Sequence, residues 1–352
     1  MSPRPRHARI DEEDVRVRPG RGSRPRTRRR PAHADAVDGL VIAVDRGRFR
    51  CWVGGRRVTA MKARELGRGT IVVGDMVSLA GEVTGAPGTL ARVVRVAPRR
   101  TVLRRSADDA DPVERVIVAN ADQLVIVCSL ADPPPRVRLI DRFLVAAYDA
   151  GIEPVLCLTK SDLAGPERIL AAYQPLGLRC LVVGRPLAER ALAPVRSVLA
   201  GRVSVLVGHS GVGKSTLVNA LVPEADRAVG AVSPATGRGR HTSSSVIALP
   251  LPGGPPGARG GPGPGRPQDA PGWIIDTPGL RGFGLGHLSA QRVARAFPDL
   301  AAGAANCPPG CDHLAPGCAL DGWAAAGPAP LAARLDSLRR LLRSREGADD
   351  TD

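Results

Sequence analysis

The 352-residue sequence has no long hydrophobic run and very little lysine. A helix that spans a membrane needs about 20 apolar residues, and no stretch of this chain approaches even ~18. The first residues also lack the apolar segment of a secretory signal, so we expect no export signal. These two absences predict a cytoplasmic protein with no membrane partner.

Lysine occurs only at Lys62, Lys160 and Lys214, and the remaining positive charges are arginine. A GC-rich coding bias explains the use of arginine in place of lysine, together with the abundance of Ala, Gly and Pro. It does not explain the net charge of +16. Such an excess favours a polyanionic partner, which can be RNA, DNA or an anionic membrane surface, and nucleic acid is the favoured choice.

The seven cysteines are an odd number and do not resemble a disulfide framework. Four of them are scattered, mostly in apolar strand-like runs, and are interpreted as small hydrophobic residues of the core: Cys51, Cys128, Cys157 and Cys180. This usage is typical of a reducing compartment.

The other three cysteines cluster with a histidine: Cys307, Cys311, His313 and Cys318 lie within twelve residues, among Pro-Gly turns. Three thiolates and one imidazole predict a single structural Zn²⁺ site with no open position for catalysis. A chance cluster or a redox role is the alternative.

Composition divides the chain into domains. Residues 1–36 form an arginine-rich arm that cannot build a core, so we predict disorder, with or without a role in tethering RNA. Residues 37–106 contain short strand-like runs between glycine-rich turns, one of them over Val72–Val77, which predicts an all-β barrel of the OB-fold type. Such a barrel either binds RNA or acts as a spacer. Residues 286–345 are helical and carry the Cys3His cluster, and 346–352 are a tail.

Residues 107–285 alternate apolar strands with helical stretches, as in an open α/β sheet. A helix is predicted over residues 137–150, and strands are predicted at 124–128, 154–158, 181–183 and 203–207. The continuous apolar run at 124–128 is expected to be buried on both faces. Residues 252–272 are almost wholly Gly, Pro and Arg, and we interpret them as a disordered hairpin insertion.

A phosphate-binding loop follows the last of these strands. It fits G-x-x-x-x-G-K-S with the residues Gly208, His209, Ser210, Gly211, Val212, Gly213, Lys214 and Ser215. Backbone N–H groups and the following helix N-terminus suit phosphates. We expect Lys214 to bridge the β- and γ-phosphates, Ser215 to ligate Mg²⁺, and Thr216 to belong to the same site.

Asp276, Thr277, Pro278 and Gly279 follow a later apolar strand, where a loop that senses the γ-phosphate belongs. Asp276 would hold Mg²⁺ through water, and the Gly279 amide would meet the γ-phosphate. Asp-Thr-Pro-Gly is a common turn sequence and is weak evidence alone, but its occurrence together with the phosphate loop makes the assignment strong.

A guanine-recognition motif precedes the phosphate loop: Thr159, Lys160, Ser161 and Asp162. Asp162 can accept hydrogen bonds from N1 and the exocyclic amine of guanine, and Lys160 would lie across the base plane. In an ordinary P-loop GTPase the phosphate loop comes first in the chain. The reversed order predicts a circularly permuted GTPase domain.

Residues 237–242 lie where a switch loop belongs, and Thr242 is the candidate switch ligand of Mg²⁺. Leu280 follows the Asp-Thr-Pro-Gly motif and cannot orient water. His241 is therefore the candidate group for that task, with Lys214 and Thr242 completing the catalytic set. The alternative for His241 is contact with RNA or solvent only.

Together these motifs resemble the circularly permuted small-ribosomal-subunit-dependent GTPases of bacteria, over residues 37–345. The resemblance includes residues 119–123, 139–142 and 211–215. It implies a multi-domain fold: an all-β OB-fold barrel, a permuted α/β P-loop GTPase domain and a small α-helical zinc-binding domain. One departure is that the guanine-contacting Ser-Ala loop of the family reads Gly184-Arg185-Pro186 here.

The resemblance further implies binding to the 30S subunit and its 16S rRNA late in assembly. Slow hydrolysis of GTP to GDP would be stimulated by the ribosome, with the histidine at position 241 proposed as catalytic. Two alternatives remain: a non-catalytic RNA-binding assembly factor with a vestigial nucleotide site, and a GTPase that signals at the membrane through its basic arm. We expect a monomer that binds GTP, GDP, Mg²⁺ and one Zn²⁺.

Overall fold

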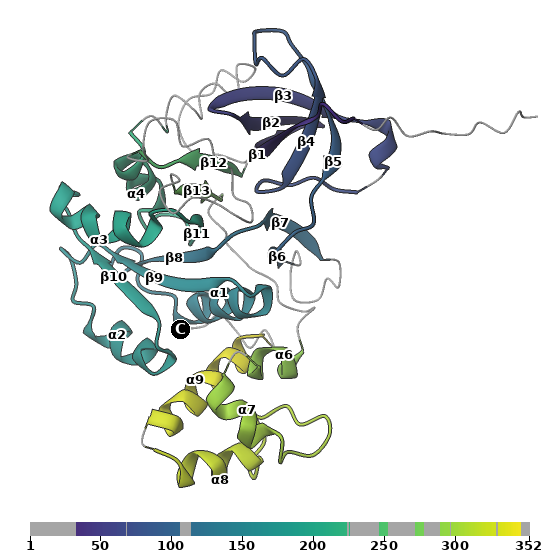
Figure 1. Cartoon of the computed structure of the whole chain (residues 1–352). Helices are drawn as coiled ribbons and strands as arrows, with labels where there is room; N and C mark the ends of the chain where they lie inside the picture. Colours follow the sequence, from purple (N-terminus) through teal and green to yellow (C-terminus); the bar gives the residue numbers. More distant parts are fainter. Residues whose placement is uncertain are drawn as a thin grey trace, which may run out of the picture. The chain divides into compact units, whose positions relative to one another are not determined.

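Figure 1 shows the computed structural model, which describes residues 33–67, 69–105, 114–223, 225, 246–252, 272–277, 289–295, 297–328 and 330–345. Outside these ranges lie most of the predicted arm, the interior of the predicted insertion and the whole tail. Three predicted site residues also lie outside the described residues: His241, Thr242 and Gly279.

The first five strands close into a barrel. Its strand order is β1-β2-β3-β5-β4, and β4 returns to pair with β1. Burial alternates along β2, as expected for a strand with one face toward the barrel interior. The N-terminal barrel is thus confirmed. Its strands are β1 (Val37–Asp45), β2 (Arg48–Val53), β3 (Arg56–Lys62), β4 (Met76–Gly81) and β5 (Ala91–Val96), with a 3-10 turn at Arg64–Leu66.

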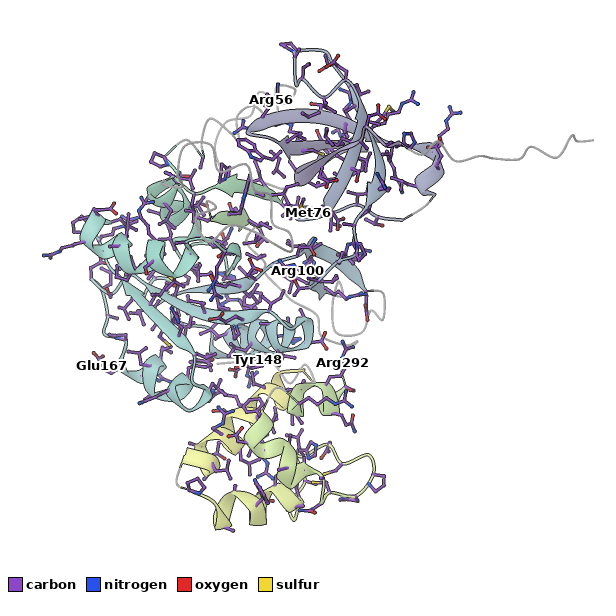
Figure 2. All side chains as sticks on the ribbon, viewed as in Figure 1. Arg56, Met76, Arg100, Tyr148, Glu167 and Arg292 are labelled. Carbon is purple, nitrogen blue, oxygen red and sulfur yellow. The ribbon has the colours of Figure 1, made fainter. Side chains whose placement is uncertain are left out.

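A two-stranded antiparallel sheet follows the barrel, formed by β6 (Val102–Arg105) and β7 (Arg115–Ala119). No sequence pattern indicated this pair of strands. The predicted boundary between the barrel and the α/β domain, at 106/107, lies between β6 and β7. Two polar anchors hold the segment. The side-chain amide of Asn120 donates to the Gly74 carbonyl at 2.9 Å, and Arg100 pairs with Asp122 at 3.0 Å (Figure 2).

The strand predicted over Val72–Val77 begins only at Met76. Asp75 is fully buried, and its carboxylate accepts the amide N–H of Val72 at 2.8 Å. Gly74 has a φ of 91°, and a Cβ there would lie 2.0 Å from a carbonyl oxygen of β7. These residues therefore form a tight turn, because the polar contact of Asp75 and the close approach of β7 outweigh the local apolar pattern.

The main sheet continues in the order β10-β9-β8-β11-β13-β12, and all of these neighbours are parallel except β12 and β13. Strands β8 and β11 are buried along their whole length, and for β8 this was predicted from its continuous apolar run. The strands are β8 (Gln123–Ser129), β9 (Glu153–Thr159), β10 (Arg179–Val183), β11 (Val203–Val207), β12 (Ile247–Pro250) and β13 (Trp273–Asp276). The helices are α1 (Val137–Ala150), α2 (Glu167–Tyr173), α3 (Glu189–Leu199) and α4 (Lys214–Leu221), with a 3-10 turn at Gln174–Leu176.

Strand β11, which leads into the predicted phosphate loop, lies between β8 and β13. In the chain, β8 precedes β11 with two strands between them, and β13 follows β11. The sheet is therefore assembled from both sides of the phosphate loop in the sequence. This is the topology expected of a circularly permuted GTPase domain.

The barrel joins the main sheet through β1 and β12, which pair antiparallel at Ala43 and Ile247. Trp52 of β2 and Trp273 of β13 meet edge to face across this junction, with ring centroids 5.6 Å apart. The barrel thus contacts the strands that flank the nucleotide motifs directly.

Four helices form the C-terminal part of the chain: α6 (Ala290–Ala294), α7 (Pro298–Ala304), α8 (Ala319–Ala326) and α9 (Pro330–Arg345). Helix α9 buries its leucines, among them Leu338 and Leu341, and packs against α1. Figure 2 shows Tyr148 and Arg292 where α1 meets these helices. Tyr148 lies edge to face with Phe297 at 5.9 Å, and Arg292 pairs with Asp149 at 2.6 Å.

A buried polar cluster also connects α9 to the α/β domain. Asp141 of α1 is fully buried and accepts hydrogen bonds from Tyr173 Oη at 2.8 Å and Arg340 Nε at 2.9 Å. The guanidinium of Arg340 also lies 5.0 Å from the centre of the Tyr173 ring. Burial raises the pKa of Asp141 to about 6, although the charge of Arg340 and the tyrosine hydrogen bond lower it. Arg340 therefore compensates a carboxylate that is costly to bury.

Replacement of Arg340 by methionine should lower the free energy of unfolding by about 3–5 kcal/mol at pH 8, because it leaves the Asp141 charge buried without its partner. Without Arg340 the pKa of Asp141 rises further above that of the unfolded chain. The folded state then binds a proton more tightly, so stability is retained at low pH and lost as the pH rises. Urea unfolding at pH 5 and pH 8 measures this difference.

Asp141→Asn in the Arg340→Met background provides the control, because it removes the titrating group. The destabilisation should then be the same at both pH values. An equal loss at pH 5 and pH 8 in the Arg340→Met protein itself would contradict the proposed charge compensation.

Candidate nucleotide-binding site and metal centre

The predicted nucleotide motifs meet at one edge of the main sheet. Strands β9, β10, β11 and β13 run parallel, so the loops after their carboxyl ends lie on the same side. These loops contain the guanine motif, residues 184–186, the phosphate loop and Thr277. The carboxyl edge of an open α/β sheet is the usual place for a nucleotide.

The phosphate loop turns sharply from β11 into α4. A Cβ at Gly208 would lie 2.5 Å from the carbonyl oxygen of Val127, so the close approach to β8 requires glycine. Gly211 and Gly213 have φ values of 84° and 90°, a region that glycine adopts without strain. The free N–H groups of the helix N-terminus begin immediately afterwards at Lys214, where an anion is favoured.

Lys214 is buried, with 7% of its surface exposed. Its ammonium group donates to Asp276 Oδ1 at 2.5 Å and to the Thr277 carbonyl. Thr277 is itself held by its hydroxyl, which donates to the carbonyl of Leu206 at 2.7 Å. The structure thus brings the predicted phosphate-binding lysine and the predicted Mg²⁺-holding carboxylate together, and the exposed Ser215 follows directly in the chain.

The guanine motif contacts the phosphate loop through Thr159. The hydroxyl of this buried residue donates to the Val212 carbonyl at 2.6 Å and lies 3.6 Å from the position of a Cβ on Gly213. The first residue of the guanine motif therefore supports the loop expected to bind phosphate. The sequence motif identified Thr159 but did not reveal this contact.

Asp162 is exposed at the same edge of the sheet. Its Oδ1 accepts the backbone N–H of Arg185 at 2.8 Å, and this hydrogen bond is the main reason that its pKa is lowered. The carboxylate is therefore ionised and available as a hydrogen-bond acceptor. Lys160, with a φ of 60°, donates from its ammonium group to the Asp132 carbonyl in the loop after β8.

Sequence reasoning did not assign roles to the contacts made by Arg185 and Asp132. Both use backbone atoms, which any residue type can supply, so no residue pattern reports them. The described residues contain two of the three predicted Mg²⁺ ligands, Ser215 and Asp276.

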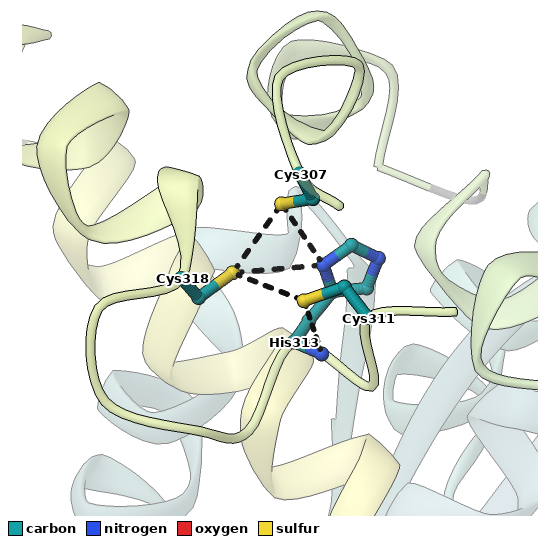
Figure 3. A group of neighbouring side chains, drawn as sticks. All are labelled: Cys307, Cys311, His313 and Cys318. Atoms are coloured by element: carbon teal, nitrogen blue, oxygen red, sulfur yellow. Dashed lines mark hydrogen bonds between the residues drawn. The ribbon is translucent and has the colours of Figure 1, made fainter. Parts of the chain in front are cut away.

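Figure 3 shows the C-terminal cluster, in which Cys307, Cys311, His313 and Cys318 converge from three turns of the chain. The Sγ atom of Cys318 lies 3.5 Å from that of Cys307, 3.8 Å from that of Cys311 and 3.7 Å from Nδ1 of His313. A tetrahedral ion with metal–sulfur bonds of about 2.3 Å places its sulfur ligands roughly 3.8 Å apart. The four donors therefore fit a tetrahedral metal ion.

The surroundings of the cluster also suit a metal. Burial lowers the pKa of His313, which favours the neutral ring that binds metals. The backbone N–H of His313 lies 3.4 Å from the Cys311 sulfur. Arg339 of α9 donates to the His313 carbonyl at 3.0 Å and to Asp321 at 2.7 Å, and it also interacts with Cys318. Such outer contacts orient ligands and stabilise thiolate charge.

Sequence comparison places the chain in a family. A family model described as RsgA GTPase matches residues 96–258. A relative from Porphyromonas gingivalis is 34% identical over 258 residues, which cover 71% of this chain and 76% of that protein. A relative from Shewanella oneidensis is 39% identical over 268 residues, with coverage of 73% and 70%. Both are named small ribosomal subunit biogenesis GTPase RsgA.

The chain belongs to the RsgA GTPase family. Two solved structures share the fold of this RsgA family member. YloQ, described as a circularly permuted GTPase, superposes with a TM-score of 0.60 at 22% identity, covering 92% of this chain and all of YloQ. YjeQ from Thermotoga maritima gives a TM-score of 0.61 at 21% identity, with 89% of this chain covered. The predicted family and the permuted fold are thereby confirmed.

Thr159→Val should lower the free energy of unfolding by about 1–3 kcal/mol, because it leaves the buried Val212 carbonyl without its donor. Valine keeps the shape of threonine, so packing is conserved. Thr159→Ser is the matched control, since it retains the hydroxyl and loses only a methyl group. Equal stability of the valine variant and the wild type in urea unfolding would show that this hydrogen bond contributes nothing.

Cys307→Ser should reduce the metal content of the purified protein from about one ion per chain to well below one, because serine is a poor ligand for such an ion. Elemental analysis by mass spectrometry measures this content. Cys180→Ser is the control, since Cys180 is a half-buried free thiol outside the cluster. Unchanged metal content in the Cys307 variant would contradict the assignment of the site.

Proposed function

We propose that this chain is a GTPase that binds the 30S ribosomal subunit and assists its late maturation, hydrolysing GTP to GDP and phosphate with stimulation by the ribosome. One observation carries the proposal: the hydrogen bond of Thr159 to Val212 joins the guanine motif to the phosphate loop, so a single nucleotide can span both. The involvement in ribosome maturation is inferred from the relatives, which are named small ribosomal subunit biogenesis GTPases.

Within this site we assign phosphate binding to the loop from Gly208 to Thr216 and guanine recognition to residues 159–162. Lys214 would exchange its bonds to Asp276 and Thr277 for oxygens of the β- and γ-phosphates. Bound Mg²⁺ would neutralise phosphate charge, held by Ser215 and Asp276.

Other assignments fall on residues outside the described ranges. The Gly279 amide would meet the γ-phosphate, Thr242 would complete the Mg²⁺ ligands, and His241 would orient the attacking water. Catalysis then consists mainly of positioning and of charge stabilisation by Lys214 and backbone amides.

We assign RNA binding to the barrel, which we propose to be an OB-fold that contacts 16S rRNA. Its strands and turns present a group of arginines, of which Arg56 is visible at the barrel surface in Figure 2: Arg46, Arg48, Arg50, Arg56 and Arg57. Guanidinium groups on a barrel surface suit phosphate and bases. The C-terminal cluster would hold one structural Zn²⁺ and so order the turns between α7 and α8.

One feature argues against a vestigial nucleotide site. A vestigial site has no need of a buried lysine, and burial of Lys214 beside Asp276 is costly without a function for its charge. Among the described helices, none has the length and apolarity to cross a membrane. We further propose, from the sequence and the named relatives, a cytoplasmic monomer that acts on ribosomes.

Lys214→Ala should lower the turnover of GTP measured with 30S subunits by at least roughly a hundredfold, because the transition-state charge loses its closest cation. Phosphate release, measured with and without 30S subunits, tests this expectation. Lys214→Arg keeps the positive charge but changes its geometry, so its GTP turnover should lie between that of the wild type and that of the alanine variant. Turnover of the alanine variant equal to that of the wild type would favour the non-catalytic RNA-binding factor.

A further inference from the structure

The loop of Gly184, Arg185 and Pro186 lies directly against the guanine motif. A Cβ at Gly184 would lie 2.6 Å from Oγ of Ser161 and 3.1 Å from the amide nitrogen of Asp162. The loop therefore packs tightly against the motif at position 184. Residue 185 is therefore held beside the carboxylate expected to read the base.

One backbone donor of this loop is already used. The N–H of Arg185 already donates to Asp162 Oδ1 at 2.8 Å, and Pro186 has no N–H. The bond fixes the rotation of the Asp162 carboxylate, which keeps lone pairs on both oxygens for further donors. Asp162 can therefore still accept from N1 and the exocyclic amine of guanine.

The chemistry of guanine places its other polar atoms next to that contact. O6 is attached to the ring carbon beside N1, and N7 lies beyond it, so both acceptors extend past the edge that faces Asp162. A long donor side chain that starts beside Asp162 can extend along this side of the base. Residue 185 lies beside Asp162 and carries such a side chain.

The side chain of Arg185 is exposed, and within the described part of the chain its guanidinium forms no ion pair and no hydrogen bond. Its positive charge is close enough to contribute to the lowered pKa of Asp162. A guanidinium presents parallel N–H donors that match O6 and N7 of guanine in a bidentate contact. Adenine has an amine in place of O6, which would oppose these donors.

We propose that Arg185 is a guanine-specificity residue whose side chain donates to O6 and N7 of the bound base. The proposal rests on the proposed function in one respect, namely that a guanine nucleotide occupies this edge of the sheet. Recognition is then divided between two side chains: Asp162 accepts from N1 and the amine, and Arg185 donates to O6 and N7.

Nucleotide analogues separate the two contacts. Dissociation constants of the full chain for GDP, 7-deaza-GDP and IDP, measured by isothermal titration calorimetry, provide the test. The 7-deaza analogue lacks the N7 acceptor, whereas IDP lacks only the exocyclic amine. We expect the wild type to bind 7-deaza-GDP several-fold more weakly than GDP. Arg185→Ala should weaken GDP and IDP binding by the same factor, roughly tenfold, and should no longer distinguish GDP from 7-deaza-GDP.

Arg185→Lys keeps the charge without the bidentate fork, so its affinity for GDP should lie between those of the wild type and the alanine variant. Arg190→Ala is the matched control, because Arg190 is an exposed arginine at the start of α3 and should leave all three constants unchanged.

The proposal is overturned if Arg185→Ala binds GDP as tightly as the wild type, or if it weakens GDP and 7-deaza-GDP equally. In either case the proposed function would still stand if the wild type binds GDP tightly and Asp162→Ala does not. Failure of the wild type to bind GDP at all would instead contradict the proposed function itself.

Discussion

The hydrogen bond from the Thr159 hydroxyl to the Val212 carbonyl is the contact on which the nucleotide site depends. It connects a loop at the end of β9 to a loop at the end of β11, although β8 lies between these strands in the sheet. In the proposed function the two loops bind opposite ends of a nucleotide, so the distance between them sets which ligand fits. Because both partners are buried, the bond cannot be replaced by water, and this makes the distance between the loops well defined.

Circular permutation changes which parts of the chain meet this site. Strand β13, with Asp276 at its end, precedes the C-terminal helices, while β8 follows directly from the barrel and the β6–β7 pair. Both of these strands flank β11. The two accessory modules are therefore attached next to the phosphate loop, where a change in bound nucleotide has its largest structural effect.

Consecutive arginines of α9 link the Cys3His cluster to the α/β domain. Arg339 donates hydrogen bonds to the His313 carbonyl in the Cys3His cluster and to Asp321 of α8. Arg340 lies against α1 and donates to the buried Asp141. Neighbouring residues on a helix point about 100° apart, so one turn of α9 serves both sides. Helix α9 therefore contacts both the Cys3His cluster and α1 through charged side chains, and it connects the C-terminal helices α6–α9 to α1.

The sequence by itself determined the family, the permuted order of the motifs and the four residues of the Cys3His cluster. Each of these depends on residue types at short, regular spacing: the glycines and Lys214 of the phosphate loop, Asp162 of the guanine motif and the Cys3His cluster. A continuous apolar run also predicted the buried strand β8, because the centre of a strand covered on both faces needs no polar positions.

Only the tertiary structure decided how these parts are joined. The turn at Asp75 replaced a predicted strand, and the bonds of Thr159 to Val212 and of Asp162 to the Arg185 amide link residues more than twenty positions apart. In each of these contacts one partner is a backbone group. Every residue carries such groups, so no amino-acid pattern shows which of them will meet, and only the packing of the folded chain makes that choice.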